Sequence, residues 1–216
     1  MLQQILKELA TTHTHLIAVS KTKPIEQIME MYHQGQRAFG ENKVQELVEK
    51  QAALPADIEW HLIGHLQTNK VKQIAPFVHL IHSVDSLKLL QEIDKQAAKN
   101  NRIIDCLLQI KIAKEVTKFG LSQKDAVGLL QSEDFQQLQH TRIVGLMGMA
   151  TFTDKENQVQ QEFRSLKTFF DKLKVSFFAN TDYFREISMG MSDDYPLAQK
   201  EGSTMVRIGS LLFGHR

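Results

Sequence analysis

Short apolar runs rich in β-branched residues alternate with helical patterns along most of the chain, and this alternation constrains the fold more than any other feature. Such alternation is typical of parallel βα units. We expect eight strands, over residues 16–21, 37–40, 59–64, 78–83, 103–111, 143–148, 186–190 and 205–209. Between them we expect helices over residues 25–34, 44–53, 68–75, 86–100, 122–130, 155–175 and 193–200.

Eight βα units within 216 residues predict an α/β fold, a single (β/α)8 barrel of the TIM type that forms one domain over residues 1–216. A doubly wound open sheet is the alternative. The first residues, MLQQILKELATT, are amphipathic and predict an extra N-terminal helix beneath or beside the barrel. Ser86 and Ser122 suit helix N-caps, and Gly202 suits a left-handed C-cap. Pro24 suits the first turn of a helix.

The composition limits the classes of partner. Lysine and arginine number 26 against 25 aspartate and glutamate residues, a balance that argues against a general nucleic-acid or membrane-surface binder. The one cysteine, Cys106, cannot form an internal disulfide, and its apolar neighbours predict a buried strand thiol. The sequence shows no secretory signal and no segment suited to span a bilayer. We therefore expect a reduced, cytoplasmic protein with no nucleic-acid or membrane partner.

The first predicted strand, LIAVSK over residues 16–21, is apolar until it ends at a lysine. Active sites of α/β barrels lie at the carboxyl ends of the strands, so this end is a candidate for chemistry. With a period of two, Lys21 shares a face with Ile17 and Val19 and would rise between apolar walls, where loss of water favours attack on a carbonyl. Alternatively, Lys21 extends into solvent. Lys23 is a competing amine, for which we expect a solvated position.

Small and polar residues follow the seventh and eighth strands. Ser192, Gly209 and Ser210 predict a phosphate cup, because backbone N–H groups and hydroxyls converge at this place in the fold. Each of the three also fits ordinary turn or cap chemistry. Asp193 and Asp194 bring negative charge close to the cup, so we expect them to point away from it or to cap the next helix.

Arg207 is an arginine within an otherwise apolar strand, where a charge without a partner is costly. We expect the guanidinium to be paired. An acidic side chain would satisfy it, or a ring nitrogen of a bound heterocycle.

The histidines do not predict a metal site. His61 and His65 have the i, i+4 spacing of a helical metal pair, but on a strand they would stand about 13 Å apart. His79 and His82 fall on opposite faces if their segment is a strand. We therefore expect no bound metal.

Seven segments match, in order, the motifs of a known family. They are AVSKTKP (18–24), FGENKVQE (39–46), WHLIGHLQTNK (60–70), HSVDS (82–86), GLMGMA (145–150), SMGMSDD (188–194) and GSTMVRIGSLLFG (202–214). On these segments the chain resembles the pyridoxal-phosphate homeostasis proteins, which are built like the barrel domain of alanine racemase, the fold-type III architecture. A KFG segment with Lys118 and Gly120 is similar to a racemase Arg-x-Gly loop, but the match is too short to carry weight.

The resemblance implies a cofactor, pyridoxal 5′-phosphate (PLP), held as a Schiff base on Lys21. It implies that Arg207 faces the pyridine nitrogen and that Asn42 and Met191 contribute to the cofactor pocket. The phosphate-binding positions that it implies are Ser192, Gly209 and Ser210.

Two functions fit a PLP barrel. The resemblance implies a role in vitamin B6 homeostasis, in which the protein holds PLP and supplies or buffers it for apo-forms of PLP-dependent enzymes. The alternative is a PLP-dependent amino-acid racemase or related enzyme. That enzyme needs a second acid/base, which in barrel racemases is a tyrosine from an additional β-domain. The chain stops at Arg216 without such a domain, and its tyrosines lack a motif context: Tyr32 lies in a helical pattern, and Tyr183 and Tyr195 stand alone. We therefore predict a monomeric carrier that is not an enzyme.

Overall fold

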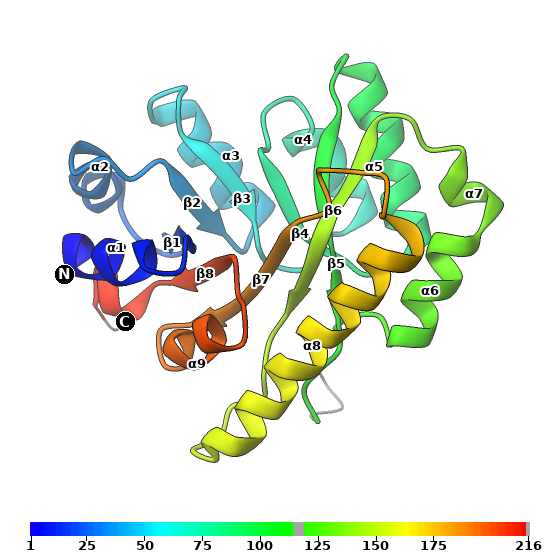
Figure 1. The fold of residues 1–216 in the computed structure, drawn as a ribbon. Helices are drawn as coiled ribbons and strands as arrows, with labels where there is room; N and C mark the ends of the chain where they lie inside the picture. The colour runs from blue at the N-terminus through cyan, green and yellow to red at the C-terminus, as the bar shows by residue number, and fades with distance from the viewer. Residues whose placement is uncertain (115–118, 215–216) are drawn as a thin grey trace.

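Eight parallel strands close into a barrel in the computed structural model, which describes residues 1–114 and 119–214 (Figure 1). Neighbours in sequence are neighbours in the sheet, and β8 pairs with β1. The predicted barrel is thereby confirmed, and the open-sheet alternative is wrong. The strands are β1 (His15–Val19), β2 (Ala38–Glu41), β3 (Glu59–Leu62), β4 (Leu80–Val84), β5 (Ile104–Ile110), β6 (Thr141–Gly148), β7 (Glu186–Met191) and β8 (Met205–Ile208).

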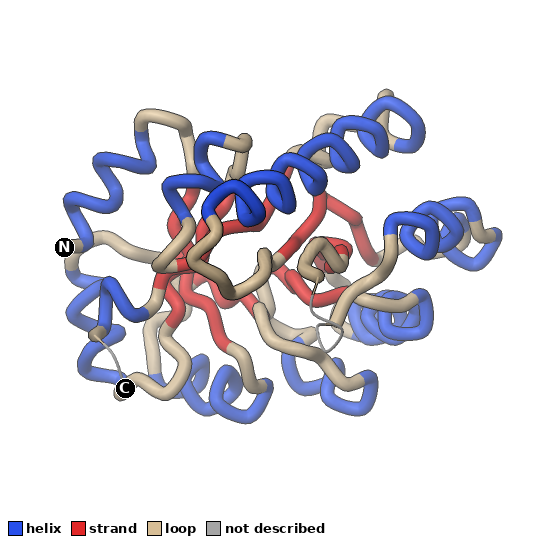
Figure 2. Tube along the Cα trace, turned by 90° about the horizontal axis from the view of Figure 1, so that it is seen from below, coloured by secondary structure: helices blue, strands red, loops and turns tan. Residues whose placement is uncertain are grey.

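Helices surround the strands, as the view from below shows (Figure 2). They are α1 (Leu2–Ala10), α2 (Ile25–His33), α3 (Val44–Ala53), the 3-10 turn η1 (Thr68–Lys70), α4 (Val71–Ile74), α5 (Leu87–Lys99), α6 (Gln123–Gln131), α7 (Glu133–Gln136), α8 (Glu156–Phe177), α9 (Tyr195–Lys200) and α10 (Ser210–Phe213). The short helices α7 and α10 were not expected from the sequence, because four residues are too few to show a period of 3.6. Among the described residues, no helix has the length and apolar character needed to cross a membrane.

The predicted cap residues occupy the ends of the helices. Ser86 and Ser122 each accept a hydrogen bond from a backbone N–H in the first turn, of Leu89 and Asp125 respectively. Gly202 has a φ of 88°, the left-handed conformation expected where α9 ends. Pro24 differs from the prediction by one position, since it is the N-cap of α2 rather than part of its first turn.

The seam between β8 and β1 is covered from outside by α1. The strands pair in parallel with His15 opposite Met205 and Ile17 opposite Arg207. The buried face of α1 packs against outward-facing strand residues in one apolar cluster, whose buried members are Leu2, Ile5, Leu9, Leu16, Val206 and Ile208. Burying an aliphatic side chain of this size stabilises a fold by roughly 1.5–3 kcal/mol, so α1 contributes substantially to closure.

The inside of the barrel is partly apolar and partly polar. One end is filled by an inner cluster that draws on five strands: Ile17, Leu80, Leu107, Val144, Met147 and Met205. Several polar side chains are also buried within the strands, and four of them are linked by hydrogen bonds: His61, His82, Ser188 and Arg207. Barrel interiors are usually filled by branched apolar residues, so these four side chains indicate a functional constraint. Cys106 lies fully buried in β5, as predicted for a structural thiol.

We predict that Gly145→Ala destabilises the chain by about 3 kcal/mol or more, because the added methyl group would overlap the backbone carbonyl of Glu186 on the paired strand β7. Urea denaturation followed by circular dichroism measures the change. Gly128→Ala is the matched control. It lies exposed in α6 with open space around it, so it should raise the free energy of unfolding by roughly 0.5–1 kcal/mol. Equal effects of the two substitutions would contradict the close approach of β6 and β7.

Candidate functional site

Lys21 lies at the carboxyl ends of the strands, in the loop that follows β1. It lines one hollow together with Gly209 and Ser210, which follow β8. Val19, at the end of β1, also lines this hollow, and Ile17 belongs to the inner cluster. The structure therefore brings together the predicted amine and two of the three residues of the predicted phosphate cup. Lys21 itself stands two residues beyond the strand rather than at its last position.

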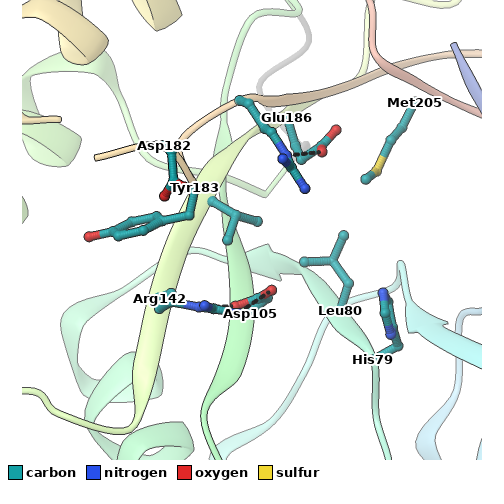
Figure 3. Close-up of a pocket in the computed structure, with 10 residues that line it drawn as sticks. His79, Leu80, Asp105, Arg142, Asp182, Tyr183, Glu186 and Met205 are labelled. Carbon is teal, nitrogen blue, oxygen red and sulfur yellow. Dashed lines mark hydrogen bonds and ion pairs between the residues drawn. The ribbon is translucent and has the colours of Figure 1, made fainter. Parts of the chain in front are cut away.

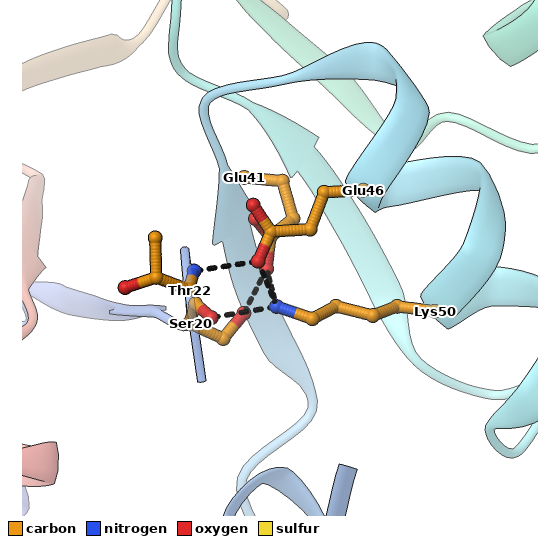
Figure 4. A network of polar contacts seen from close by, with 5 residues as sticks. All are labelled: Ser20, Thr22, Glu41, Glu46 and Lys50. Carbon is orange, nitrogen blue, oxygen red and sulfur yellow. Dashed lines mark hydrogen bonds and ion pairs between the residues drawn. The ribbon is translucent and has the colours of Figure 1, made fainter. Parts of the chain in front are cut away.

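The loop that carries Lys21 is anchored on both sides (Figure 4). Before it, the hydroxyl of Ser20 donates to a carboxylate oxygen of Glu41, at 2.7 Å. After it, the backbone N–H of Thr22 donates to a carboxylate oxygen of Glu46, at 2.5 Å. Thr22 has a φ of 62°, so the chain turns sharply just past the lysine. The two glutamates thus fix the position of the backbone at Lys21.

Lys50 joins the two glutamates in a buried network. Its ammonium donates to Glu41 at 2.8 Å, to Glu46 at 2.7 Å and to the carbonyl of Ser20 at 2.7 Å. Burial raises the pKa of the Glu41 carboxyl, and the hydrogen bonds from Lys50 and Ser20 oppose that rise. Lys50 is 6% exposed and Glu41 is fully buried, so each charge depends on the other.

Lys23, the competing amine, lines the same hollow as Lys21, and its ammonium is hydrogen-bonded. Its ammonium donates to the carbonyls of Phe213 and Gly214 at the end of α10, at 2.9 and 3.1 Å. We expected Lys23 to be solvated, but the carbonyls that α10 leaves free at its C-terminus bind it.

The residues of the predicted phosphate cup are in contact. The backbone N–H of Gly209 donates to the hydroxyl of Ser192, at 3.3 Å, which joins the loops after β8 and β7. Gly209 is also the N-cap of α10, and a Cβ there would lie 3.2 Å from the carbonyl oxygen of Val19. Only glycine brings the backbone so close to β1 without displacing it. Ser210 begins α10 and lines the hollow that contains Lys21.

The acidic pair next to the cup differs in part from the expectation, because the side chain of Asp194 forms no cap hydrogen bond with α9. The carboxylate of Asp194 accepts the backbone N–H of Met191, at 2.6 Å, and Asp194 is the N-cap residue of α9. Burial raises the pKa of the Asp194 carboxyl. Asp193 is exposed. Met191, a predicted pocket residue, ends β7 and pairs in register with Arg207.

Arg207 is 4% exposed and bound by neutral groups. Its guanidinium donates to the hydroxyl of Ser188 at 2.6 Å and to the carbonyl of Gly148 at 3.1 Å. Burial lowers the pKa of Arg207 to about 10, and the charge of Asp194 opposes that shift. Within residues 1–114 and 119–214, no carboxylate forms an ion pair with this guanidinium, so of the two alternatives the acidic side chain is not the partner there. Without a carboxylate partner, the guanidinium of Arg207 can donate hydrogen bonds to a neutral acceptor.

A chain of buried hydrogen bonds continues from Ser188 through two histidines. Ser188 Oγ lies 2.9 Å from His82 Nδ1, and His82 Nε2 lies 2.9 Å from His61 Nδ1. Burial lowers the pKa of His61 to about 3 and that of His82 well below its usual range, so both rings are neutral. The sequence gives no sign of these hydrogen bonds, because the partners lie on different strands.

Other predicted positions lie apart from these contacts. His61 and His65 do not meet: His65 follows β3, pairs with Asp85 at 3.4 Å and stacks on Phe119. Asn42 directly follows β2, next to the end of β1. Gly120 is described and has a φ of 129°, but Lys118 falls outside the described residues.

The three residues that anchor the Lys21 loop, Glu41, Glu46 and Lys50, have partial signals in the sequence. Glu41 and Glu46 lie in the FGENKVQE segment, and Lys50 follows Glu46 by four residues, the spacing of an ion pair on one helix. The contact of these residues with the Lys21 loop depends on the packing of α3 and has no local signal.

The sequence of residues 2–216 matches the family model described as alanine racemase, N-terminal domain. A curated protein of Aquifex aeolicus, named pyridoxal phosphate homeostasis protein, is 41% identical over 202 residues, which cover 93% of this chain and 86% of the relative. A human protein of the same name is 34% identical over 220 residues, covering 97% of this chain and 79% of the relative.

Solved structures agree with this relationship. PipY of Synechococcus elongatus with PLP bound is 37% identical, with a TM-score of 0.86, and the match covers 99% of this chain and 100% of PipY. An alanine racemase of Clostridium difficile superposes with a TM-score of 0.77 at 15% identity, covering 100% of this chain and 56% of the racemase. At that identity the racemase shows a shared fold only.

We predict that Lys50→Ala lowers the free energy of unfolding by about 3–5 kcal/mol near neutral pH, because Glu41 is left as a buried charge without its partner. The folded-state pKa of Glu41 is already raised, and it rises further without Lys50. Protonated Glu41 therefore adds stability at low pH that is lost as the pH rises, so the deficit of the variant should shrink at about pH 5.

Urea denaturation at the two pH values measures this deficit. Lys95→Ala, at an exposed lysine of α5, is the control and should change stability by less than about 0.5 kcal/mol at both. A Lys50→Ala deficit that does not change with pH would contradict the coupling of Lys50 to Glu41.

Proposed function

The chain belongs to the family of alanine racemase N-terminal domains, among the pyridoxal phosphate homeostasis proteins, and from this premise we propose that it binds PLP covalently on Lys21 and acts in PLP homeostasis. The observation that carries the proposal is the shared hollow of Lys21, Gly209 and Ser210 at the barrel mouth. In this role the protein holds PLP and supplies or buffers it for apo-forms of PLP-dependent enzymes.

The chemistry of these residues fits the groups of PLP. When bound, PLP supplies an aldehyde for a primary amine, a phosphate dianion and a pyridine nitrogen. Lys21 provides the amine on an anchored loop. The hydroxyls of Ser192 and Ser210 and the backbone N–H of Gly209 are donors of the kind that bind a phosphate. We assign Asn42 and Met191, which follow or end neighbouring strands, to the rim of the same pocket.

Arg207 suits the pyridine nitrogen. A guanidinium has only donors, and it stays charged here because its lowered pKa of about 10 is still well above neutrality. A cation at this position disfavours protonation of the ring nitrogen and therefore weakens the ring as an electron sink. This effect favours storage of the cofactor over chemistry at an amino-acid α-carbon.

The positions of the three tyrosines also support a carrier. Tyr32 donates to Asp57 from α2, and Tyr195 donates to Glu8 of α1 on the outside of the barrel. Tyr183 lines a hollow with residues that begin the strands, at the end opposite Lys21. None of the three is placed to move a proton beside Lys21. We further propose that the protein is a cytoplasmic monomer whose partners are apo-enzymes.

We predict that borohydride reduction of the PLP-loaded protein, followed by peptide mass mapping, places the pyridoxyl adduct on Lys21. Lys21→Ala should lose the adduct but still bind PLP more weakly, because the phosphate donors remain. Lys23→Ala is the control and should keep the adduct on Lys21, since Lys23 contacts α10. Equilibrium dialysis compares PLP with pyridoxal, which lacks the phosphate and should bind much more weakly. An adduct on Lys23, or equal affinity for both ligands, would contradict the assignment.

We predict that the PLP-loaded protein does not turn over amino acids at an enzymatic rate, because none of its three tyrosines lies beside Lys21 to serve as the second acid/base. Incubation with a panel of L-amino acids, with chirality and products measured by chromatography, tests this. A known racemase run in parallel is the positive control. Turnover above about one per second, the low end of ordinary enzymes, would restore the racemase alternative.

A further inference from the structure

The end of the barrel opposite Lys21 contains two adjoining hollows lined by residues that begin the strands. His79, Glu186 and Met205 line both of them, and Figure 3 shows these three side chains around one. The other has a volume of about 400 Å³ and is also lined by Glu59 and His61. The hollow lies at the opposite end of the barrel from the proposed cofactor site, and its lining includes three histidines, His15, His61 and His79, and the carboxylates of Glu59 and Glu186.

His61 leaves one ring nitrogen without a partner. The side chain is 2% exposed, and its Nδ1 is 2.9 Å from His82. Its Nε2 is buried and has no hydrogen-bond partner among the described residues. An unpaired buried nitrogen costs about 1–3 kcal/mol, so a group that binds it would recover that cost.

Glu59 and His79 are held next to this nitrogen by the sheet. Glu59 and His61 are two residues apart on β3 and therefore share a face. The backbone N–H of His79 donates to the carbonyl of Trp60 at 2.8 Å, which sets His79 beside His61, with 5.2 Å between the ring centroids. One ligand atom from each of Glu59, His61 and His79 lies within 4.8 Å of the others. His79 immediately precedes β4, so the strand rule that placed it opposite His82 does not apply.

We propose that Glu59, His61 and His79 bind a divalent transition metal of the Zn²⁺ type at the N-terminal end of the barrel. Two imidazoles and one carboxylate are the ligands that such a cation prefers, whereas Mg²⁺ and Ca²⁺ prefer oxygen alone. Ligand atoms around Zn²⁺ stand about 3.3 Å apart, so the exposed side chains of Glu59 and His79 need to move by only about 1 Å. This proposal replaces the expectation of no metal.

His82 would act as a positioning residue for this site. A cation on His61 Nε2 requires the proton of that ring on Nδ1, where it donates to His82 Nε2. His82 then carries its own proton on Nδ1 and donates to Ser188 Oγ, which also accepts from Arg207. The metal therefore sets the direction of the hydrogen bonds that lead to Arg207.

The test is a titration of Zn²⁺ into chelator-treated, tag-free protein without PLP, and binding is measured by isothermal titration calorimetry. We expect one Zn²⁺ per chain. His79→Ala and Glu59→Gln should each weaken binding by about tenfold or more, and both residues are exposed, so the fold should persist. His33→Ala, at a histidine of α2 outside the hollow, is the matched control and should leave binding unchanged.

His82→Phe keeps the three ligands but removes the acceptor for His61, so it should weaken Zn²⁺ binding by about 10- to 100-fold while circular dichroism stays native. Co²⁺ in place of Zn²⁺ gives a second readout, because tetrahedral Co²⁺ with imidazole ligands absorbs visible light and Co²⁺ in water absorbs little. The proposal is overturned if wild-type protein binds Zn²⁺ no more tightly than about 1 mM. It is equally overturned if His79→Ala and Glu59→Gln both bind as well as wild type.

Discussion

The pairing of β8 with β1 is the contact on which the rest of the site depends. Because both strands are parallel and adjacent, their carboxyl ends meet, and the loop with Lys21 lies against the turn with Gly209 and Ser210. The first and last strands of an open sheet need not be neighbours, and the amine and the phosphate donors would then be separate. Closure between segments so distant in the sequence costs chain entropy, which the apolar face of α1 helps to offset by covering the seam.

Closure also encloses polar groups that would otherwise reach water. Arg207 contacts Ser188, Ser188 contacts His82, and His82 contacts His61, so hydrogen bonds link four strands, β8, β7, β4 and β3, through the inside of the barrel. An apolar filling would be less costly to bury, because every member of such a chain loses hydration and must recover it through geometry. The chain is therefore best explained by function: one end approaches the cofactor mouth through Arg207, and the other presents His61 Nε2 to the opposite hollow.

The architecture and the position of Lys21 at the barrel mouth could be predicted from the sequence, because both have local signals. Strands and helices show their periods, and an apolar strand that stops at a lysine marks the barrel mouth. What the sequence could not show are contacts between elements. The pairing of His61 with His82 depends on the alignment of β3 with β4, and Lys50 reaches the Lys21 loop only because α3 packs there. For the same reason the sequence could not identify the partner of the Arg207 guanidinium, since Ser188 and Gly148 lie on other strands.

Lys21 and the proposed phosphate donors are held by different parts of the fold, and this separation suits the proposed binding and release of PLP. Glu41, Glu46 and Lys50 hold the loop of Lys21 from β2 and α3. The turn after β8 is held instead by Ser192 and by its close approach to β1. In the proposed site, reversal of a covalent bond at Lys21 would leave the phosphate donors in place, so the cofactor would be retained without the bond. A carrier built in this way can tune retention and release through separate contacts.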